Sequence, residues 1–212
     1  AVADWIGEAG LRVSPDQVLA LAGSQQGLDF AAKLLIDRGT PMLTEAPTYV
    51  AALQVFELFG ADLCTVPLTG NGPDLATLEA TLARHRPRCI YLIPSFQNPS
   101  GTCYSAETRA AIAALLDHYE VTLIEDEPYR SVALDVDHAM LPICAQLRRA
   151  HWIYLGSFSK ILWPGWRIVA PSTPFDYVGL MNSALRCEDP VLVIEHVALY
   201  GSSGPGPLED LD

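Results

Sequence analysis

The sequence predicts an α/β fold with a mostly parallel sheet flanked by helices. Short apolar runs alternate with longer segments in which apolar residues recur every three or four positions, and this pattern is typical of buried parallel strands joined by amphipathic helices. The chain has 212 residues, half of them hydrophobic, so it is long enough to bury a substantial core. We therefore expect one main α/β domain.

Each expected helix or strand has a typical length, and two of the helices are followed by a glycine that would end them. The expected strands are residues 18–22, 41–45, 62–67, 88–93, 121–125 and 152–156, each short enough for a strand buried between two layers. The expected helices are residues 28–38, 49–59, 75–84 and 107–119, with Gly39 and Gly60 placed as C-terminal stops for the first two.

Composition argues against several classes of protein. The net charge of -12 does not suit a surface for nucleic acid, which needs clustered positive charge. No apolar run approaches the roughly 20 residues that cross a bilayer, and the first ten residues carry Asp4 and Glu8 instead of a basic signal region. We expect a soluble cytoplasmic protein with no nucleic-acid or membrane partner.

Cysteine and histidine spacing predicts no metal site and no disulfide framework. The five cysteines form an odd set without Cys-x-x-Cys spacing, and the five histidines are dispersed. We expect reduced thiols.

Polar residues that follow the strands are the candidate site, because ligands of open α/β sheets collect at the carboxyl ends of strands. Gly23-Ser24-Gln25-Gln26-Gly27 follows the first expected strand and precedes a helix, where backbone N–H groups and the helix dipole suit a phosphate. A turn that merely caps the helix is an equally good explanation. Tyr49, in Glu-Ala-Pro-Thr-Tyr, puts an aromatic ring at the mouth of the sheet, although simple packing at a helix start would also account for it.

Two further turns carry polar side chains. Asn98 lies in Pro-Ser-Phe-Gln-Asn-Pro-Ser-Gly, and Asn-Pro is also a common turn initiator. Asp126 and Tyr129 follow the strand at 121–125, where a solvated acidic loop is the alternative because Glu125 and Glu127 flank the aspartate.

Lys160 is the most informative residue of the sequence. It lies in Ser-Phe-Ser-Lys-Ile-Leu-Trp-Pro-Gly-Trp-Arg, residues 157–167, and it is one of only two lysines, whereas the other eleven basic residues are arginine. A lysine amine can deprotonate and attack a carbonyl, and a guanidinium cannot. A surface lysine after a strand is the alternative.

These segments resemble pyridoxal-phosphate aminotransferases of class I/II, fold type I, whose motif is Ser-x-Ser-Lys followed by Pro-Gly-x-Arg. The resemblance is greatest for the 2-aminoadipate aminotransferase subgroup, and the aminotransferase-like domains of MocR-type regulators share the patterns. It implies pyridoxal 5'-phosphate as cofactor, bound as a Schiff base, the internal aldimine, on Lys160. It also implies that Asp126 keeps the pyridine nitrogen protonated and that Tyr49 stacks on the ring. The resemblance further implies that the phenolic oxygen of the cofactor is contacted by Asn98 and Tyr129. It implies that the phosphate is bound by Ser24, Gln25, Ser157 and Arg167.

The resemblance implies exchange of an amino group between an amino acid and a 2-oxo acid in a homodimer. Two alternatives remain open. One is a ligand-sensing module like the MocR effector domain, and the other is a truncated or chimeric chain that binds cofactor without turnover.

The pattern changes after Arg167. Residues 168–212 are similar to part of the β subunit of thiamine-diphosphate-dependent 2-oxoacid dehydrogenases, with an expected helix at 177–186, a strand at 191–194 and a mobile tail at 201–212. We therefore expect a cofactor-binding domain over 1–167 and a segment of different resemblance over 168–212.

Overall fold

The computed structural model describes residues 2–21, 23–132, 140–158, 167–169 and 191–193. The chain divides into two compact units, Ala1–Lys160 and Ile161–Asp212, and each is described by itself.

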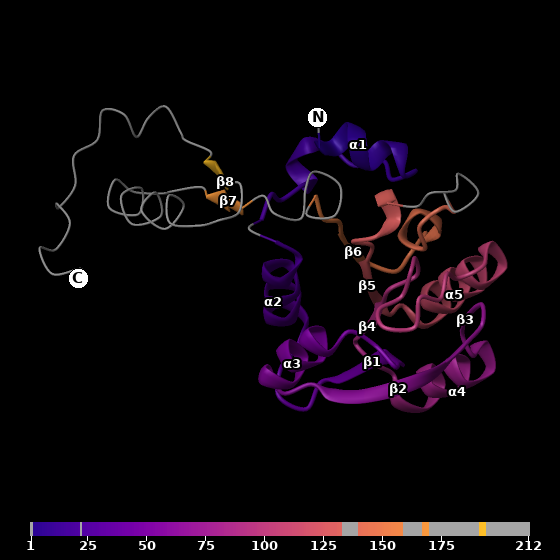
Figure 1. Cartoon of the computed structure of the whole chain (residues 1–212). Helices are drawn as coiled ribbons and strands as arrows, with labels where there is room; N and C mark the ends of the chain where they lie inside the picture. The colour runs from indigo at the N-terminus through magenta and orange to yellow at the C-terminus, as the bar shows by residue number, and fades with distance from the viewer. Residues whose placement is uncertain (1, 22, 133–139, 159–166, 170–190, 194–212) are drawn as a thin grey trace, which may run out of the picture. The chain divides into compact units, whose positions relative to one another are not determined.

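A six-stranded sheet with helices around it forms the first unit (Figure 1). Its order is β3-β2-β1-β4-β5-β6, and all neighbours are parallel except β2 and β3. The strands are β1 Pro41–Ala46, β2 Asp62–Thr69, β3 Gly72–Pro73, β4 Cys89–Leu92, β5 Thr122–Asp126 and β6 Trp152–Leu155. The helices are α1 Val2–Glu8, α2 Ser24–Leu35, α3 Val50–Leu58, α4 Leu75–His85 and α5 Ala106–Tyr119, with short 3-10 turns at Pro15–Gln17, Arg130–Val132 and Cys144–Gln146. The predicted α/β class with a mostly parallel sheet is confirmed.

The sheet separates two hydrophobic cores, because successive side chains of a strand point to opposite faces. Ile90 and Leu123 belong to the core that also contains Leu78 and Leu82 of α4 and Ile112 and Leu116 of α5. Their neighbours Tyr91 and Ile124 belong to the other core, with Leu28 and Ala31 of α2 and Ala52 and Phe56 of α3. Helices α2 and α3 therefore cover one face, and α4 and α5 cover the other (Figure 1).

Side-chain caps fix where α4 and α5 begin. The Asp74 carboxylate accepts a hydrogen bond from the Thr77 N–H at 2.7 Å, and the Ser105 hydroxyl accepts one from the Thr108 N–H at 3.1 Å. Both satisfy backbone donors that a helix leaves unpaired at its first turn. The position of α5 matters for the site, because the segment that leads into it follows β4.

Three expectations for the N-terminal part are wrong. Residues 18–21 form no strand, and the side chain of Leu19 is 68% exposed, so this apolar run is not packed between two layers. Helix α2 begins at Ser24, four residues before the apolar spacing starts, because its first turn consists of Ser24, Gln25, Gln26 and Gly27, which add no apolar side chain to the pattern. Gly39 is not a helix stop: α2 ends at Leu35, and the Gly39 N–H donates to the Gly60 carbonyl at 2.7 Å.

Strand β2 also differs from its expected burial. It extends to Thr69, and only Val66 along it is buried. The reason is its place in the sheet, since its outer neighbour β3 has only two residues and covers little of it.

In the second unit the structure describes two short strands, β7 Arg167–Val169 and β8 Val191–Val193, which pair in parallel. The expected strand at 191–194 is present as β8, and it pairs with β7 in a separate sheet. The expected helix at 177–186 and the tail at 201–212 lie outside the described residues.

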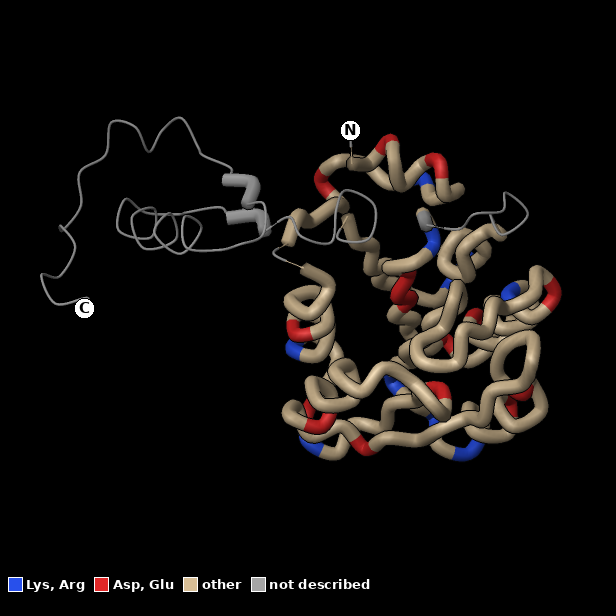
Figure 2. The backbone as a smooth tube through the Cα atoms, in the orientation of Figure 1, with Lys and Arg blue, Asp and Glu red and all other residues tan. Residues whose placement is uncertain are grey.

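Acidic and basic positions are interspersed along the described backbone instead of being gathered by sign (Figure 2). None of the described helices is long and apolar enough to cross a membrane. In the same residues no group of three or more histidine, cysteine or acidic side chains could hold a metal ion.

Candidate active site

Asp126 ends β5 on the face of the sheet that α2 and α3 cover. Asp126 lies two positions after Ile124, so both side chains are on the same face of the sheet as Tyr91 of β4. The Tyr91 hydroxyl donates to Asp126 Oδ2 at 2.7 Å. The other carboxyl oxygen, Oδ1, is buried and has no hydrogen-bond partner among the described residues. A buried acceptor without a donor is costly, so Oδ1 indicates a place where a ligand N–H is missing.

Burial raises the pKa of Asp126 to about 6, with a further rise from the charges of Glu127 and Glu45, whereas the hydrogen bond from Tyr91 opposes the rise. The Asp126 side chain is only 3% exposed. A positively charged partner at Oδ1 would reverse the shift, because an opposite charge favours the ionised carboxylate.

Glu45 of β1 is a buried carboxylate at the end of a strand that β4 separates from β5, and it lies on the opposite face of the sheet from Asp126. Its Oε1 accepts from the Ile93 N–H at 2.6 Å and from the Tyr104 hydroxyl, and its Oε2 accepts from the Gln97 amide at 2.6 Å and from the Thr48 hydroxyl at 3.3 Å. Burial raises the pKa of Glu45, while these donors act in the other direction. The carboxylate therefore joins the segment after β1 to the segment after β4.

The turn that carries Asn98 is held by the residue before it. The Gln97 side chain donates to the Pro47 carbonyl at 2.7 Å and accepts from the Ser100 N–H at 2.9 Å and from the Ser100 hydroxyl at 2.6 Å. The Gln97 N–H also donates to the Thr102 carbonyl at 2.9 Å. Asn98 itself is half-buried at the tip of this arrangement.

Arg109 of α5 binds the residues on both sides of the turn that carries Asn98. This guanidinium is 1% exposed, and it donates to the carbonyls of Pro94 and Tyr104 at 2.9 and 3.2 Å and to the Ser95 hydroxyl at 2.9 Å. It also pairs with Glu127 at 3.2 Å. Both ends of the segment between β4 and α5 are thus fixed by one side chain.

Glu125, one residue before Asp126, points to the α4 and α5 face. It accepts from the N–H groups of Ile143 and Cys144 at 2.9 and 2.8 Å, and burial raises its pKa to about 6. Glu125 and Glu127 are fully buried, so the alternative of a solvated acidic loop around Asp126 is wrong.

The first turn of α2 lies near the start of α3. Gly23 at the N-cap has no side chain to cap the helix, and the Gln25 amide donates to the Ala51 carbonyl at 3.3 Å. Ser24 is the first helical residue, but residues 18–21 before it form no strand. Tyr49 is the N-cap of α3 and packs half-buried against the core of this face.

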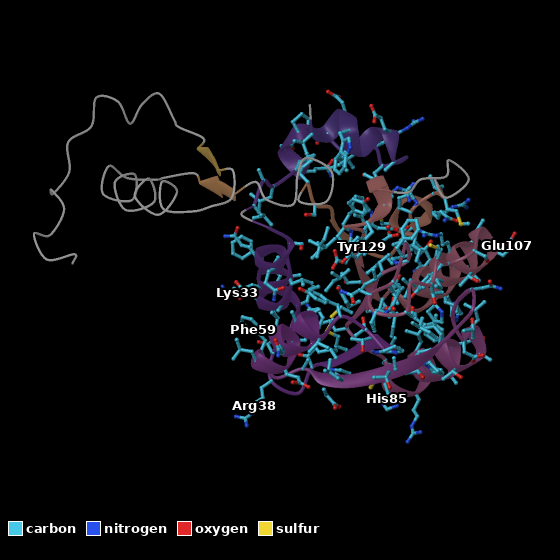
Figure 3. The ribbon with its side chains drawn as sticks, in the orientation of Figure 1. Lys33, Arg38, Phe59, His85, Glu107 and Tyr129 are labelled. Atoms are coloured by element: carbon cyan, nitrogen blue, oxygen red, sulfur yellow. The ribbon has the colours of Figure 1, made fainter. Side chains whose placement is uncertain are left out.

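The predicted residues after β5 and β6 are only partly described. Tyr129 is half-buried in the segment after β5 (Figure 3). Ser157 is half-buried after β6, next to Phe158, whose ring centroid lies 4.8 Å from that of Trp5 in α1. Lys160 lies outside the described residues, and Arg167 is described only as the first residue of β7.

The structure thus brings Asp126, Tyr49 and the start of α2 to one face and places Asn98 at the neighbouring strand end. Four residues of the site were not predicted from the sequence, namely Tyr91, Glu45, Gln97 and Arg109. The sequence did contain a signal for Glu45, because a charged residue there ends a short segment that was expected to be a buried strand. Tyr91 carried none, because it reads as one more apolar residue of β4.

A parallel sheet with acidic, amide and aromatic side chains at the carboxyl ends of its strands places this chain in the class of open α/β domains, which collect ligands at those ends. The family "Aminotransferase class I and II" matches residues 1–184. The chain belongs to the aminotransferase class I and II family, which confirms the predicted family and fold type, and pyridoxal phosphate is the cofactor that this family implies.

Similar proteins include enzymes and regulators. The 2-aminoadipate transaminase of Thermus thermophilus is 44% identical over 171 residues, which are 79% of this chain and 41% of that protein. A crystal structure of α-aminoadipate aminotransferase from Thermus thermophilus, complexed with N-(5'-phosphopyridoxyl)-L-leucine, has a TM-score of 0.67 and 43% identity over 78% of this chain and 42% of that one. An uncharacterized HTH-type transcriptional regulator of Bacillus subtilis is 32% identical over 168 residues, 79% of this chain and 35% of the regulator. The chain spans about two fifths of the length of the first two.

Proposed function

We propose that this chain forms the cofactor-binding domain of a pyridoxal-phosphate aminotransferase and takes part in amino-group exchange between an amino acid and a 2-oxo acid. The observation that carries the proposal is Asp126 Oδ1, a buried acceptor at the carboxyl end of β5 for which the described residues supply no donor. A protonated pyridine nitrogen would supply both the missing hydrogen and the positive charge. The residues present therefore fit the group.

When bound, pyridoxal phosphate supplies an electrophilic carbonyl carbon and an aromatic ring that takes up electron density. The chain's own residues have separate tasks. Asp126 would hold the proton on the ring nitrogen, Asn98 and Tyr129 would hydrogen-bond the phenolic oxygen, and Tyr49 would stack on the ring.

The phosphate and the reactive amine complete the proposal. The first turn of α2, with Ser24 and Gln25, suits a phosphate through its backbone N–H groups and its dipole, together with Ser157 and Arg167. Lys160 would hold the cofactor through its Nζ and carry the proton that moves between substrate and cofactor carbons.

The two lysines give a direct test of the attachment point. The chain should be incubated with pyridoxal phosphate, reduced with borohydride and digested, and the modified peptide should contain Lys160. Lys33 is the matched control, because it is exposed and pairs with Asp29 at 2.6 Å (Figure 3). Lys33→Arg should keep the label and Lys160→Arg should lose it; a label on Lys33 alone would contradict the proposal.

The substrate class and the assembly belong to the same proposal. The names of the relatives support an amino acid and its 2-oxo acid as substrates. A homodimer is supported by exposed apolar side chains on neighbouring helices, namely Phe30 and Leu34 of α2 and Val50 and Leu58 of α3. A cytoplasmic location is supported by the free thiols of Cys64, Cys89, Cys103 and Cys144, which suit a reducing compartment.

We also propose that residues 168–212 form a segment distinct from the cofactor-binding domain over 1–167. The separate pairing of β7, which begins at Arg167, with β8 supports a boundary near this residue, whereas the division into compact units after Lys160 favours an earlier one. The family match to residue 184 speaks for a later boundary. Limited proteolysis that releases a stable fragment ending near 167 or near 184 would decide between them.

A second candidate is a ligand-sensing module that binds the same cofactor, and the similar Bacillus subtilis regulator favours it. Single-turnover titration with a panel of amino acids separates the two. An enzyme domain converts its bound cofactor to the amine form, whereas a sensor changes its affinity or assembly without that conversion.

A further inference from the structure

Tyr91 is a fully buried tyrosine whose hydroxyl meets a candidate site residue. It lies in β4 beside Ile124 of β5, and its ring packs edge to face on Phe56 of α3 with centroids 5.4 Å apart. The strand register and this ring contact both fix the direction of the hydroxyl. Burial, with the neighbouring Asp126 charge, raises the pKa of Tyr91 well above its usual range, so the hydroxyl stays a donor at every physiological pH.

The bond at Oδ2 makes the two Asp126 oxygens unequal. Oδ2 receives the Tyr91 hydroxyl at 2.7 Å, and Oδ1 has no partner in the described part of the chain. A donor on one oxygen orients the carboxyl group about its last bond, which leaves the other oxygen in a fixed direction.

The surroundings of Asp126 otherwise oppose its charge. Burial is the largest influence, and the carboxylates of Glu127 on β5 and Glu45 on β1 add repulsion, whereas Tyr91 on β4 acts in the other direction. Arg109, the buried cation of this region, pairs with Glu127 and not with Asp126. Tyr91 is therefore the neighbour that favours the ionised form.

We propose that Tyr91 is a positioning residue for the aminotransferase site: its hydroxyl holds the Asp126 carboxyl group ionised and aims Oδ1 at a ring N–H. This inference rests on the proposed function, because Asp126 matters to the reaction only if it pairs with the ring nitrogen. The Tyr91 hydroxyl acts through Asp126 and touches neither substrate nor cofactor.

The first experiment needs no cofactor. Carbon-13 NMR of the full chain with labelled aspartate, with the Asp126 signal assigned by Asp126→Asn, should show Asp126 titrating near pH 6. Tyr91→Phe keeps the ring contact and removes the donor, and it should raise the Asp126 pKa by about one unit or more, since a hydrogen bond to a charged group is worth that much. An unchanged titration would overturn the proposal.

Tyr104→Phe is the matched control. Tyr104 is equally buried, and its hydroxyl donates to Glu45 instead of Asp126, so this variant should not raise the Asp126 pKa. If Tyr91→Phe failed to fold, a fluorinated tyrosine at position 91 would replace it; the stronger donor should lower the Asp126 pKa, and a rise would contradict the proposal.

The second experiment adds pyridoxal phosphate and measures its dissociation constant against pH. Tyr91→Phe should weaken binding about fivefold near pH 6 and approach parity near pH 8.5, where Asp126 is ionised in both proteins. A loss that is independent of pH would indicate a merely structural role for Tyr91. Asp126→Asn separates the two claims: if it leaves cofactor binding unchanged, the proposed pairing of Asp126 fails, while the cofactor-free titration still decides the role of Tyr91.

Discussion

The Gln97 amide donates to the Glu45 carboxylate at 2.6 Å, and the two residues are 52 positions apart in the chain. The same amide nitrogen donates to the Pro47 carbonyl at 2.7 Å. The loop that carries Tyr49 and the turn that carries Asn98 are thus tied together by contacts within the protein. The candidate site is pre-organised by its own residues, which is what binding without a large ordering cost requires.

Glu45→Gln should destabilise the cofactor-free chain by about 2–4 kcal/mol. The amide group of the glutamine would place its own N–H donors against groups that now donate hydrogen bonds to the Glu45 carboxylate. Urea denaturation measures the free energy of unfolding. Glu79→Gln, at an exposed position of α4, should change it by less than about 0.5 kcal/mol. A Glu45→Gln protein as stable as the original chain would refute the role of this carboxylate.

The stability of the cofactor-free chain should fall as pH rises from about 4 to about 6.5. Burial raises the pKa of Asp126 to about 6, so the folded chain holds a proton that the unfolded chain has already released. This stabilisation is complete below the unfolded pKa near 4 and is lost as pH passes the folded pKa, a loss of roughly 2–3 kcal/mol.

The measurement is urea unfolding at pH 4.5 and pH 7, and Asp126→Asn should reduce the difference between the two. Asp74→Asn is the control. The hydrogen bond from Thr77 lowers the pKa of the exposed Asp74, so its contribution changes only below about pH 4. Stability that rises across this interval would contradict the assignment of a raised pKa to Asp126.

Arg109→Met should cost about 3–5 kcal/mol, because it leaves Glu127 buried without its cation and frees the carbonyls of Pro94 and Tyr104. Arg149→Met provides the contrast. Arg149 pairs with Glu120, but both side chains are at least 60% exposed, and such pairs contribute no more than about 1 kcal/mol. Thermal melts of the two variants should differ clearly, and similar melting temperatures would count against the buried network.

Gly72→Ala should cost about 1–3 kcal/mol. Gly72 has φ +125°, and an added Cβ would lie 2.9 Å from Thr108 Cγ2 and 3.0 Å from the Tyr104 ring, the ring whose hydroxyl reaches Glu45. Gly70→Ala is the matched control, because nothing lies within 4 Å of a Cβ there. Urea denaturation of the two proteins side by side checks the difference. Equal midpoints would show that the Tyr104 ring can move away from the added Cβ without loss of stability.

Residues next to strand ends could be predicted from the sequence, whereas the contacts that position them could not. Asp126 and Asn98 follow apolar runs directly, so local periodicity was sufficient to find them. The partners of Glu45 lie as far as 59 residues away, and Tyr91 meets Asp126 only because of the β4 and β5 register. Such pairings depend on tertiary packing, which no local pattern encodes.

The strand expected at residues 18–22 also shows that tertiary packing is not encoded locally. Its apolar composition matches that of β4, but β4 has a paired strand on both edges, and residues 18–21 take no part in the sheet. Composition predicts what a segment can bury, and its neighbours decide whether it does.

The contact between Trp5 and Phe158 gives the molecule an optical reporter. Their rings lie 4.8 Å apart, and Phe158 precedes Lys160 by two residues. The emission of an indole depends on its surroundings, so the fluorescence of Trp5 would change if the ring of Phe158 moved away from it. Helix α1, to which no catalytic role is assigned, would thus report on the residue that follows Ser157 of the candidate site.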